Sequence, residues 1–527
     1  MEDLNPRFVE AMSRADCRPV WLVRVSINRA ETISFVSRGT SGMDYPASVD
    51  SVSTVSAKID PFSREFSTNM VDVTFVDDGT IRDLASTRWV KGKRIDILLG
   101  AVGLTEGDFE SRFSGVIDDP QPDEGSLVLH CTDLSSSLRD TSVQGFWINV
   151  HPIEVIASIE PTLASATGIH FEAHTFRPDY DDRTKHWKVS RHARFDGDLT
   201  PSPMPTIRVP VGSMQLVNEI LALTGGSLVV NRFGNMEYVP FHADAPPIRT
   251  LGRDDIGDMR QLATAAHLTN HHTITFLKDG TKLPNGHAVY KHGSNDPQAQ
   301  TDIAYPGTIR RIVATSEETD WLNAETRLAS SISSGAGAGS TFDVVSPVLF
   351  GLPTSFVDPA HRVIFLVDDE LIECDLATAL PGADGELVTP DGMIAYLWRY
   401  RISQRALFGT EQLSHTPDSG GGGYVVDYTI AVSVTDRKVS RFSHGIPIVE
   451  ITTSMAQLDL DLGDAIALED DVALWTGFDG VDTSLIWEIV GKEELPSDDS
   501  PRITFTLAVL RREIQLPQVI SGSGGET

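Results

Sequence analysis

The sequence contains few cysteines and no long apolar run, and both absences exclude classes of protein. Its 527 residues include three cysteines, Cys17, Cys131 and Cys374, which lie far apart. An odd number without metal-ligand spacing predicts neither a disulfide framework nor a zinc site. The longest apolar stretches, such as residues 95–102, contain an Asp and a Gly and are far shorter than a bilayer span. We therefore expect no disulfide-stabilised fold and no membrane anchor.

Targeting and catalytic motifs are absent as well. Residues 1–16 lack the basic segment and apolar core of a secretory signal. The chain contains no G-x-S-x-G nucleophile elbow, and neither H-E-x-x-H nor a phosphate-binding G-x-x-x-x-G-K-[ST] loop. These absences favour a protein that is not an enzyme and holds no metal or cofactor.

Positive charge is scarce, since the formal net charge is −31 at pH 7. A nucleic-acid binder places cations on phosphates, so this balance opposes non-specific binding of DNA. Two interpretations remain open. The charge can simply keep the protein soluble, or it can form an acidic wall around a lumen through which DNA passes without sticking.

The composition is that of a globular chain with several domains. Hydrophobic residues make up 40% and charged residues 22% of the sequence, which excludes extensive disorder. The length corresponds to three or four domains of roughly 150 residues each.

Residues 51–134 contain short strands at close spacing. Val71, Val73 and Phe75 alternate with polar residues, and the same alternation recurs over residues 94–99 and 127–132. Period-2 alternation with turn residues between the runs predicts an antiparallel β-barrel or sandwich. We expect a short helix at residues 6–14 before it, a first strand at 20–25, and Trp89 and Phe109 as core aromatics.

A similar pattern returns near the C-terminus. Val449, Ile451 and Thr453 alternate with polar residues, and residues 458–468 have the form strand, Gly-Asp, strand. Both terminal regions also contain an acidic hairpin, at 118–125 and at 493–500. We interpret the two regions as a duplicated barrel.

The segments between the barrels predict mixed structure. Pro152 suits the first turn of a helix, and Ser213 can cap a second helix that Gly225 and Gly226 end, before a hairpin over 227–241. Residues 321–331 suggest a further helix, and 415–424 a mobile loop. The predicted fold class is a β-rich α+β multidomain protein with two antiparallel β-barrel domains and α/β inserted domains. The expected domains are 1–145 (first barrel), 146–276 (helix and hairpin, with an exposed arm at 170–210), 277–425 (loop-rich insert with strands), 426–515 (second barrel) and 516–527 (disordered tail).

Candidate ligand groups are weak. His267 and His271 are four residues apart and His272 follows, but the segment reads as the start of a strand, whereas zinc ligands at this spacing lie on a helix and need a further ligand. Paired aspartates are a second candidate, for glycosidase chemistry or for calcium, yet all lie where Asp stabilises turns. The pairs are Asp77/Asp78, Asp118/Asp119, Asp254/Asp255 and Asp498/Asp499.

The arm mixes aromatic and basic residues. Phe171, Tyr180 and Trp187 are the interface candidates, because aromatic residues and Arg concentrate at the cores of protein contacts. Such mixtures also bind nucleic acid or sugar, and an ordered internal loop is the remaining interpretation.

The order of these parts resembles that of bacteriophage tail hub proteins. An expected strand over residues 51–58 is followed by Asp60-Pro61 and by a strand that ends at Asp77-Asp78-Gly79. The next strand has the sequence K-G-K-R-I-D-I-L-L-G at 91–100, and a hairpin up to Leu134 follows it. The helix, double glycine and hairpin over 213–241 are also similar to that family. The resemblance covers 20–145, 150–276 and 430–512, and nothing comparable is found for 277–425.

The resemblance implies a virion protein at the tail tip of a long, non-contractile-tailed phage, assembled in the host cytoplasm. In that family, which is similar to the baseplate hub of contractile phages, two barrels per chain and three chains per ring match a six-fold tube to three-fold central proteins. The implied partners are further copies of the chain, the distal tail ring protein, the tape measure protein and a central fibre or spike. The ring would gate DNA passage during host attachment.

Two other functions stay open. A β-protein that binds or degrades host envelope polysaccharide would need a cleft lined by aromatic and acidic residues, whereas the eight tryptophans are scattered along this chain. A hub of a secretion or contractile-injection system shares the fold that the resemblance implies.

Overall fold

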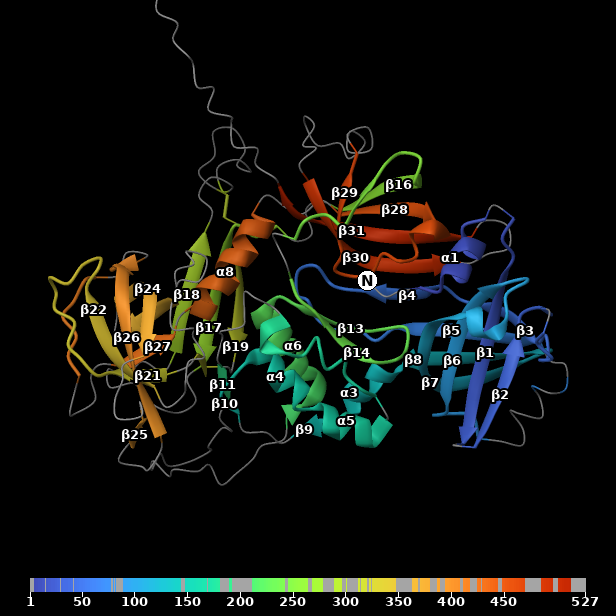
Figure 1. Ribbon diagram of the computed structural model, residues 1–527, viewed down its shortest axis with the longest axis horizontal. Coiled ribbons are helices and arrows are strands. Elements are labelled where there is room, and N and C mark those ends of the chain that lie inside the picture. The colour runs from blue at the N-terminus through green and yellow to red at the C-terminus, as the bar shows by residue number, and fades with distance from the viewer. Residues whose placement is uncertain are drawn as a thin grey trace, which may run out of the picture. The chain divides into compact units, whose positions relative to one another are not determined.

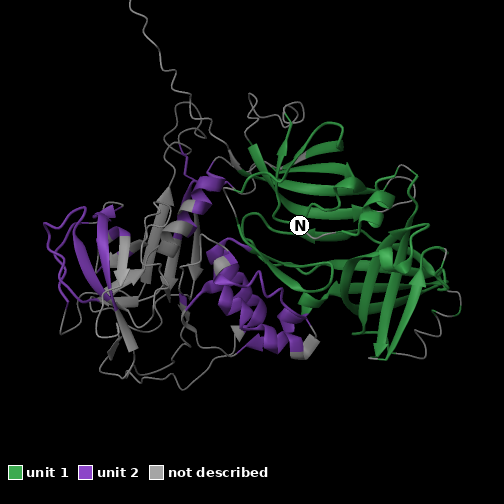
Figure 2. Cartoon of the chain, in the orientation of Figure 1, with its two compact units in different colours: residues 1–136, 227–267, 445–527 green, residues 137–226, 268–444 purple. Residues whose placement is uncertain are grey.

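The computed structural model divides into two compact units, each assembled from separate stretches of the chain (Figure 2). Unit 1 comprises residues 1–136, 227–267 and 445–527, and unit 2 comprises residues 137–226 and 268–444. The structure describes residues 4–14, 16–28, 30–40, 42–76, 79, 81, 89–143, 147–167, 169–180, 189–191, 211–241, 245–263, 268–277, 289–295, 300, 311–312, 314–319, 322–323, 325–346, 363–367, 370–379, 386–388, 394–407, 411–417, 424–427, 429–443, 448–469, 485–495 and 501–512.

Unit 1 begins with helix α1 (Pro6–Met12), followed by a seven-stranded antiparallel sheet, called the first sheet (Figure 1). Asn5 caps the helix, since its side-chain oxygen accepts the N–H of Arg7 at 3.0 Å. The strands of the first sheet lie in the order β2 (Glu31–Val36), β1 (Pro19–Asn28), β6 (Arg94–Ala101), β7 (Glu110–Asp123), β8 (Ser126–Asp133), β5 (Met70–Val76) and β3 (Val49–Val52).

The two edges of the first sheet approach each other. The N–H of Val36, at the end of β2, donates to the carbonyl of Pro46 at 3.0 Å, and the N–H of Val76 donates to the carbonyl of Ser48 at 2.8 Å. The segment before β3 therefore bonds both to β2 and to β5, which closes the sheet toward a barrel. Alternate residues of β5 and β8 are buried inside it, as the period-2 pattern predicts.

The second sheet of unit 1 is built from distant parts of the chain. Its order is β15 (Arg249–Leu251), β29 (Ala465–Leu468), β30 (Leu485–Leu495), β31 (Arg502–Arg512), β28 (Ile448–Ser454) and β16 (Ile256–Ala263), and β4 (Val55–Lys58) also pairs with β30. Only β15 and β29 run parallel among these pairs. The insertion of 268–444 between β16 and β28 explains why this sheet is discontinuous in sequence.

The two sheets share one strand order. In the first sheet β5, β6, β7 and β8 follow one another in sequence and lie in the spatial order β6-β7-β8-β5. In the second sheet β28, β29, β30 and β31 also follow one another and lie in the order β29-β30-β31-β28. The flanking strands correspond as well, since β3 lies beside β5 and β16 lies beside β28.

Irregularities in the pairing repeat at matching positions. The register shifts at Ile117/Asp119 in β7, against β8, and at Ile489/Gly491 in β30, against β31. It shifts again at Val49/Ser51 in β3, against β5, and at Ile256/Asp258 in β16, against β28. Because a register shift needs an extra residue at one place in one strand, these two coincidences align β7 with β30 and β3 with β16 around the shifted positions.

The turn that leads into β6 in the first sheet is repeated before β29 in the second sheet. The N–H of Gly92 donates to the carbonyl of Ile117 at 2.7 Å, and the N–H of Gly463 donates to the carbonyl of Ile489 at 2.8 Å. Both glycines have positive φ, +73° and +85°, a conformation that glycine adopts without a steric penalty. We conclude that unit 1 contains a duplicated sheet, as the sequence pattern predicts.

A hairpin and short 3-10 turns complete unit 1. The hairpin consists of β13 (Ser227–Val230) and β14 (Met236–Val239). The 3-10 turns are η1 (Glu106–Asp108), η2 (Leu134–Ser136) and η5 (Met455–Gln457).

Unit 2 combines helices with a closed barrel (Figure 1). Strands β22 (Thr341–Ser346), β21 (Glu325–Leu328), β27 (Tyr424–Asp427), β23 (Val363–Val367), β24 (Glu370–Ala379) and β26 (Ile394–Gln404) pair in that order, β22 also pairs with β26, and β25 (Glu386–Val388) extends from β26. Phe342, Phe365 and Tyr400 pack together in its core, with ring centroids 4.7–6.1 Å apart. The sequence resemblance gave no account of this barrel.

The remaining elements of unit 2 are short. The helices are α3 (Ser137–Asp140), α4 (Pro152–Ala157), α5 (Glu160–Thr167), α6 (Ser213–Thr224) and α8 (Thr429–Phe442), with the 3-10 turn η3 (Pro178–Tyr180). The strands are β9 (Ser142–Val143), β10 (Trp147–Val150), β11 (Val189–Arg191), β12 (Val211–Gly212), β17 (His271–Leu277), β18 (Val289–Asn295), β19 (Ala314–Thr319) and β20 (Leu322–Asn323). Within the described residues, no helix is long and apolar enough to cross a membrane.

Several local predictions need comment. The β-rich multidomain class is confirmed, as are the helix ends at Pro152 and Gly225. The helix expected over 321–331 is wrong: β20 and β21 occupy its described part, because pairing in sheets outweighed the local spacing. Trp89 is 75% exposed and is not a core residue, whereas Phe109 is buried.

Candidate functional site at the seam between the two sheets

The first and second sheets of unit 1 share a continuous stretch of backbone. Ser53 and Thr54 separate β3, which pairs in the first sheet, from β4, which pairs with β30 in the second. The N–H of Ile59 continues this pairing by donating to the carbonyl of Val490 at 2.7 Å. The sequence predicted one strand over 51–58. The structure instead divides this stretch between two sheets, and the strand donated by the first sheet defines the seam.

The turn after β4 places a buried cation in the seam. The carboxylate of Asp60 accepts the N–H groups of Phe62 and Ser63 at 2.9 and 2.6 Å, and Arg64 follows with φ of 59°. A non-glycine residue holds such a backbone only when its surroundings fix it. Here the Arg64 guanidinium bonds the carboxylate of Glu488 in β30, with N–O distances of 2.8 and 2.9 Å.

Arg64 also contacts the segment around the hairpin. Its Nη1 donates to the hydroxyl of Ser227 at 3.3 Å, and its guanidinium lies 4.8 Å from the ring centroid of Phe241. A cation over an aromatic face is attracted by the ring electrons. Arg64 therefore ties together the donated strand, the hairpin segment and the second sheet.

A second buried ion pair crosses the seam between β7 and β30. Arg112 meets Glu494 in a bidentate arrangement, with Nε donating to Oε2 at 2.7 Å and Nη2 donating to Oε1. Their side chains are 5% and 4% exposed. Lys492 lies beside them, with Nζ 3.5 Å from Glu494 and donating to the carbonyl of Leu458 at 2.9 Å.

The protonation states in this pair are fixed by the partners. Burial by itself would raise the pKa of Glu494, but Arg112 and Lys492 outweigh it and hold the pKa below its ordinary value. Burial opposes the charge of Arg112 too, yet Glu494 outweighs that effect and keeps the pKa of the guanidinium raised. The carboxylate of Glu494 therefore stays ionised between Arg112 and Lys492, which balance its charge.

The hairpin of β13 and β14 lies across the same seam. Arg232 pairs with Glu110 of β7 at 3.2 Å, and its carbonyl accepts the hydroxyl of Ser111 at 2.6 Å. On the other side, a Cβ at Gly463 would come within 2.3 Å of Val239 in β14. The hairpin therefore touches the first sheet through its turn and the second sheet through its last strand.

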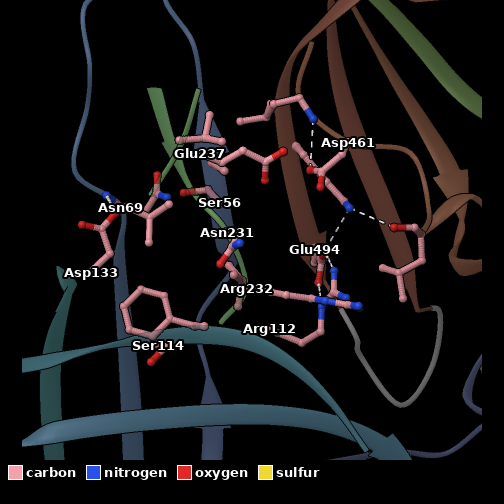
Figure 3. A pocket seen from close by; sticks show the side chains of 18 of the residues that line it. Ser56, Asn69, Arg112, Ser114, Asp133, Asn231, Arg232, Glu237, Asp461 and Glu494 are labelled. Atoms are coloured by element: carbon pink, nitrogen blue, oxygen red, sulfur yellow. Dashed lines mark hydrogen bonds and ion pairs between the residues drawn. The ribbon is translucent and has the colours of Figure 1, made fainter. Parts of the chain in front are cut away.

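These contacts line a partly open cavity of about 90 Å³ (Figure 3). Phe113 is the one aromatic residue among the described residues that line it. The volume has room for several water molecules. Its lining consists of Leu4, Val55, Ser56, Ala57, Asn69, Arg112, Phe113, Ser114, Asp133, Val229, Val230, Asn231, Arg232, Glu237, Leu458, Asp459, Asp461, Leu462, Lys492 and Glu494.

The two predicted interface residues that the structure describes, Phe171 and Tyr180, do not lie in this seam. Phe171, in unit 2, is buried against Phe176 with ring centroids 4.7 Å apart. Tyr180 is 37% exposed and meets His174 edge-on. Trp187 lies outside the described residues. An interface role for these residues stays a prediction.

The histidine and aspartate candidates that the structure describes lie in turns or strands. Asp255 accepts the N–H of Gly252 at 3.0 Å within a turn, as expected of turn aspartates, and Asp118 and Asp119 are exposed. His271 begins strand β17. Asp77, Asp78, Asp498, Asp499 and His267 lie outside the described residues. Among the described residues, no three His, Cys, Asp or Glu side chains are grouped to hold a metal ion.

We expect the seam to open in acid. A carboxyl whose pKa is lowered on folding contributes stability above its unfolded pKa, and this stability is lost as the pH falls through the folded value. Glu494 and Asp459, which pairs with Arg249, both have lowered pKa values. Hydrogen-exchange protection of residues 55–59, corrected for intrinsic rates, should hold from pH 7 to 5 and fall below about pH 4, near the ordinary carboxyl pKa.

The matched control for this acid response is Glu494→Gln. Because the amide carries no titrating group, this variant should show lower protection at pH 7 and a smaller further loss in acid. An unchanged acid response in Glu494→Gln, or protection that falls as the pH rises, would contradict the assignment.

No sequence pattern indicated these buried charges. Arg112, Glu488 and Glu494 lie within strands, and their ion-pair partners are far away in the sequence. The glycine turns at Gly92 and Gly463 relate the two sheets, but they do not identify the ion pairs.

No protein-family model matches the chain, and no curated protein matches it. Solved structures give matches over nearly the whole chain at low identity. The tail protein from Neisseria meningitidis is 9% identical with a TM-score of 0.44, covering 93% of this chain and 96% of that one. The 43 kDa tail protein of prophage MuSo2 from Shewanella oneidensis is 12% identical with a TM-score of 0.41, covering 94% and 98%. Prophage tail protein gp18 from Listeria monocytogenes is 8% identical with a TM-score of 0.39, covering 93% and 94%.

Proposed function

We propose that this chain is a structural hub protein of a phage tail tip, and that three copies form a ring between the end of the tail tube and a central fibre or spike. The duplicated sheet of unit 1 is the observation that carries the proposal. A chain with two matching sheets offers two similar contact surfaces, and a ring of three chains then offers six. Such a ring suits a junction between six-fold and three-fold parts.

The seam supports a structural role in this proposal. A shared strand and two buried ion pairs, Arg64–Glu488 and Arg112–Glu494, hold the two sheets in one arrangement. A fixed angle between the sheets is what a closed ring needs, because rings close only for one rotation between neighbours. The distal tail ring protein and the tape measure protein are the proposed neighbours of the ring.

The charge balance fits a passage for DNA. With a net charge of −31, a ring of these chains would repel phosphates, so DNA could pass during genome delivery without binding. The ring would act in the virion, and the chain would carry out no reaction of its own.

Immunogold electron microscopy of intact particles tests the proposal. Antibody raised against this chain should label the tail tip alone, because a hub lies at one end of the tube. Light scattering on the purified chain should give a mass three times that of the 57.4 kDa protomer. Label along side fibres would instead indicate a receptor-binding or glycan-binding role, and absence from particles would overturn the proposal.

A further inference from the structure

The strand donated at the seam, β4, pairs with one edge of β30. The N–H of Ile59 donates to the carbonyl of Val490, so these two residues form a hydrogen-bonded pair. Such pairs alternate along antiparallel strands. The next two are Ala57 with Lys492 and Val55 with Glu494. The N–H groups of Lys492 and Glu494 therefore bond the donated strand.

The first sheet has a matching edge on β7. The register shift at Ile117/Asp119 corresponds to the shift at Ile489/Gly491, so Pro120 is the counterpart of Lys492 and Pro122 the counterpart of Glu494. Pairing of β6 with β7 ends at Val116. Beyond that point no strand in the described part of the chain pairs with this side of β7.

The two prolines face this open side with their nitrogen atoms. Asp123 pairs with Ser126 across the two-residue turn of the β7–β8 hairpin, and the residues that close such a turn are hydrogen-bonded to each other. By alternation Gln121 also bonds β8, while the backbone of Pro120 and Pro122 points away from β8. Proline has no N–H, so this edge offers carbonyl acceptors and no donor at these two positions.

We propose that Pro120 and Pro122 prevent the first sheet from accepting an added strand at the edge that matches the one where the second sheet accepts β4. The second sheet accepts β4 through the N–H groups of Lys492 and Glu494, whereas the matching edge of the first sheet cannot accept a strand in the same register. Proline on an open edge is a known protection against pairing with other chains. Two copies of the chain therefore cannot join at this edge by the strand addition that joins the two sheets within one chain.

A peptide of residues 53–60, Ser-Thr-Val-Ser-Ala-Lys-Ile-Asp, reproduces the donated strand and tests the block. Fluorescence anisotropy of the labelled peptide with the full chain should show no binding beyond that of a scrambled peptide. Pro120→Thr/Pro122→Thr restores both donors and should bind it roughly tenfold tighter or better, since each net hydrogen bond contributes severalfold. Each single variant should fall between.

Two controls separate edge pairing from other effects. The same peptide methylated at the Ala57 nitrogen loses a donor and should bind the double variant no better than the scrambled peptide does. Gln121→Thr changes the neighbouring residue, whose N–H faces β8, and should bind like the wild type. Binding of the peptide by the wild type as tightly as by the double variant would overturn the proposal. The proposal would also be overturned if the single and double variants had the melting temperature of the wild type and did not bind the peptide. Neither result depends on whether the chain forms a tail hub.

Discussion

Arg112→Leu is expected to destabilise unit 1 by about 3–5 kcal/mol, because it leaves the carboxylate of Glu494 buried without its main partner. Both side chains are at most 5% exposed, so water compensates the lost guanidinium only in part. Lys492, 3.5 Å from Glu494, remains as a partial partner and places the expected effect toward the lower end of that range. Calorimetry and hydrogen exchange over β4 and β30 measure the loss.

A matched variant on the same sheet isolates the effect of burial. Arg94 pairs with Asp96 on β6 at 3.1 Å, and these side chains are 47% and 26% exposed. Arg94→Leu should therefore cost less than about 1 kcal/mol. The double variant Arg112→Met/Glu494→Leu should recover much of the lost stability, since removing both charges avoids an uncompensated ion. A cost for Arg112→Leu no greater than that for Arg94→Leu would contradict this account of the seam.

Glu370→Gln is expected to have a comparable effect in unit 2. Glu370 is fully buried at the start of β24 and receives donors from Arg405, His415 and two backbone N–H groups. Nη1 of Arg405 also donates to the carbonyls of Ser333 and Ala336, at 2.7 and 3.2 Å. The carboxylate therefore holds Arg405, Ala406, Leu413 and His415, and through Arg405 the turn at 333–336. Burial opposes its charge, yet Arg405 and the other donors outweigh this and lower its pKa.

Replacing that carboxylate by an amide leaves the Arg405 guanidinium buried without a counter-charge. The expected loss is about 3–5 kcal/mol, with faster proteolysis and faster hydrogen exchange at residues 405–417. Asp375→Asn is the control on the same strand, because its pair with Arg401 is 38% and 45% exposed, and it should change little. Equal melting temperatures for the two variants would show that the Glu370 cluster does not hold this part of the barrel.

Much of unit 1, and the ends of two helices in unit 2, could be predicted from local patterns. Alternation in β5, β8 and β28 identified the strands and their buried faces, because side chains of a strand point alternately to its two sides. The ends of α4 and α6 followed from Pro152 and Gly225, whose backbone preferences act locally. The duplication was also visible, since each half repeats the same strands and turns.

The sequence did not indicate which strands would pair with one another. Val55–Lys58 reads as the continuation of β3, and its transfer to β30 depends on a strand more than 400 residues later in the chain. Residues 321–331 had helical spacing, yet sheet pairing decided their structure. In both cases long-range pairing outweighed a local preference. Trp89 was expected in the core, but it is exposed.

The sequence by itself determined which segments form strands, where helices and hairpins turn, and that one half of unit 1 repeats the other. These properties depend on side-chain periodicity and on the backbone limits of proline and glycine, which neighbouring residues suffice to express. Only the tertiary structure decided that β4 crosses the seam and that Arg64 and Arg112 become buried opposite Glu488 and Glu494. A charge is buried only where a distant partner compensates it, and the chain brings such partners together only on folding.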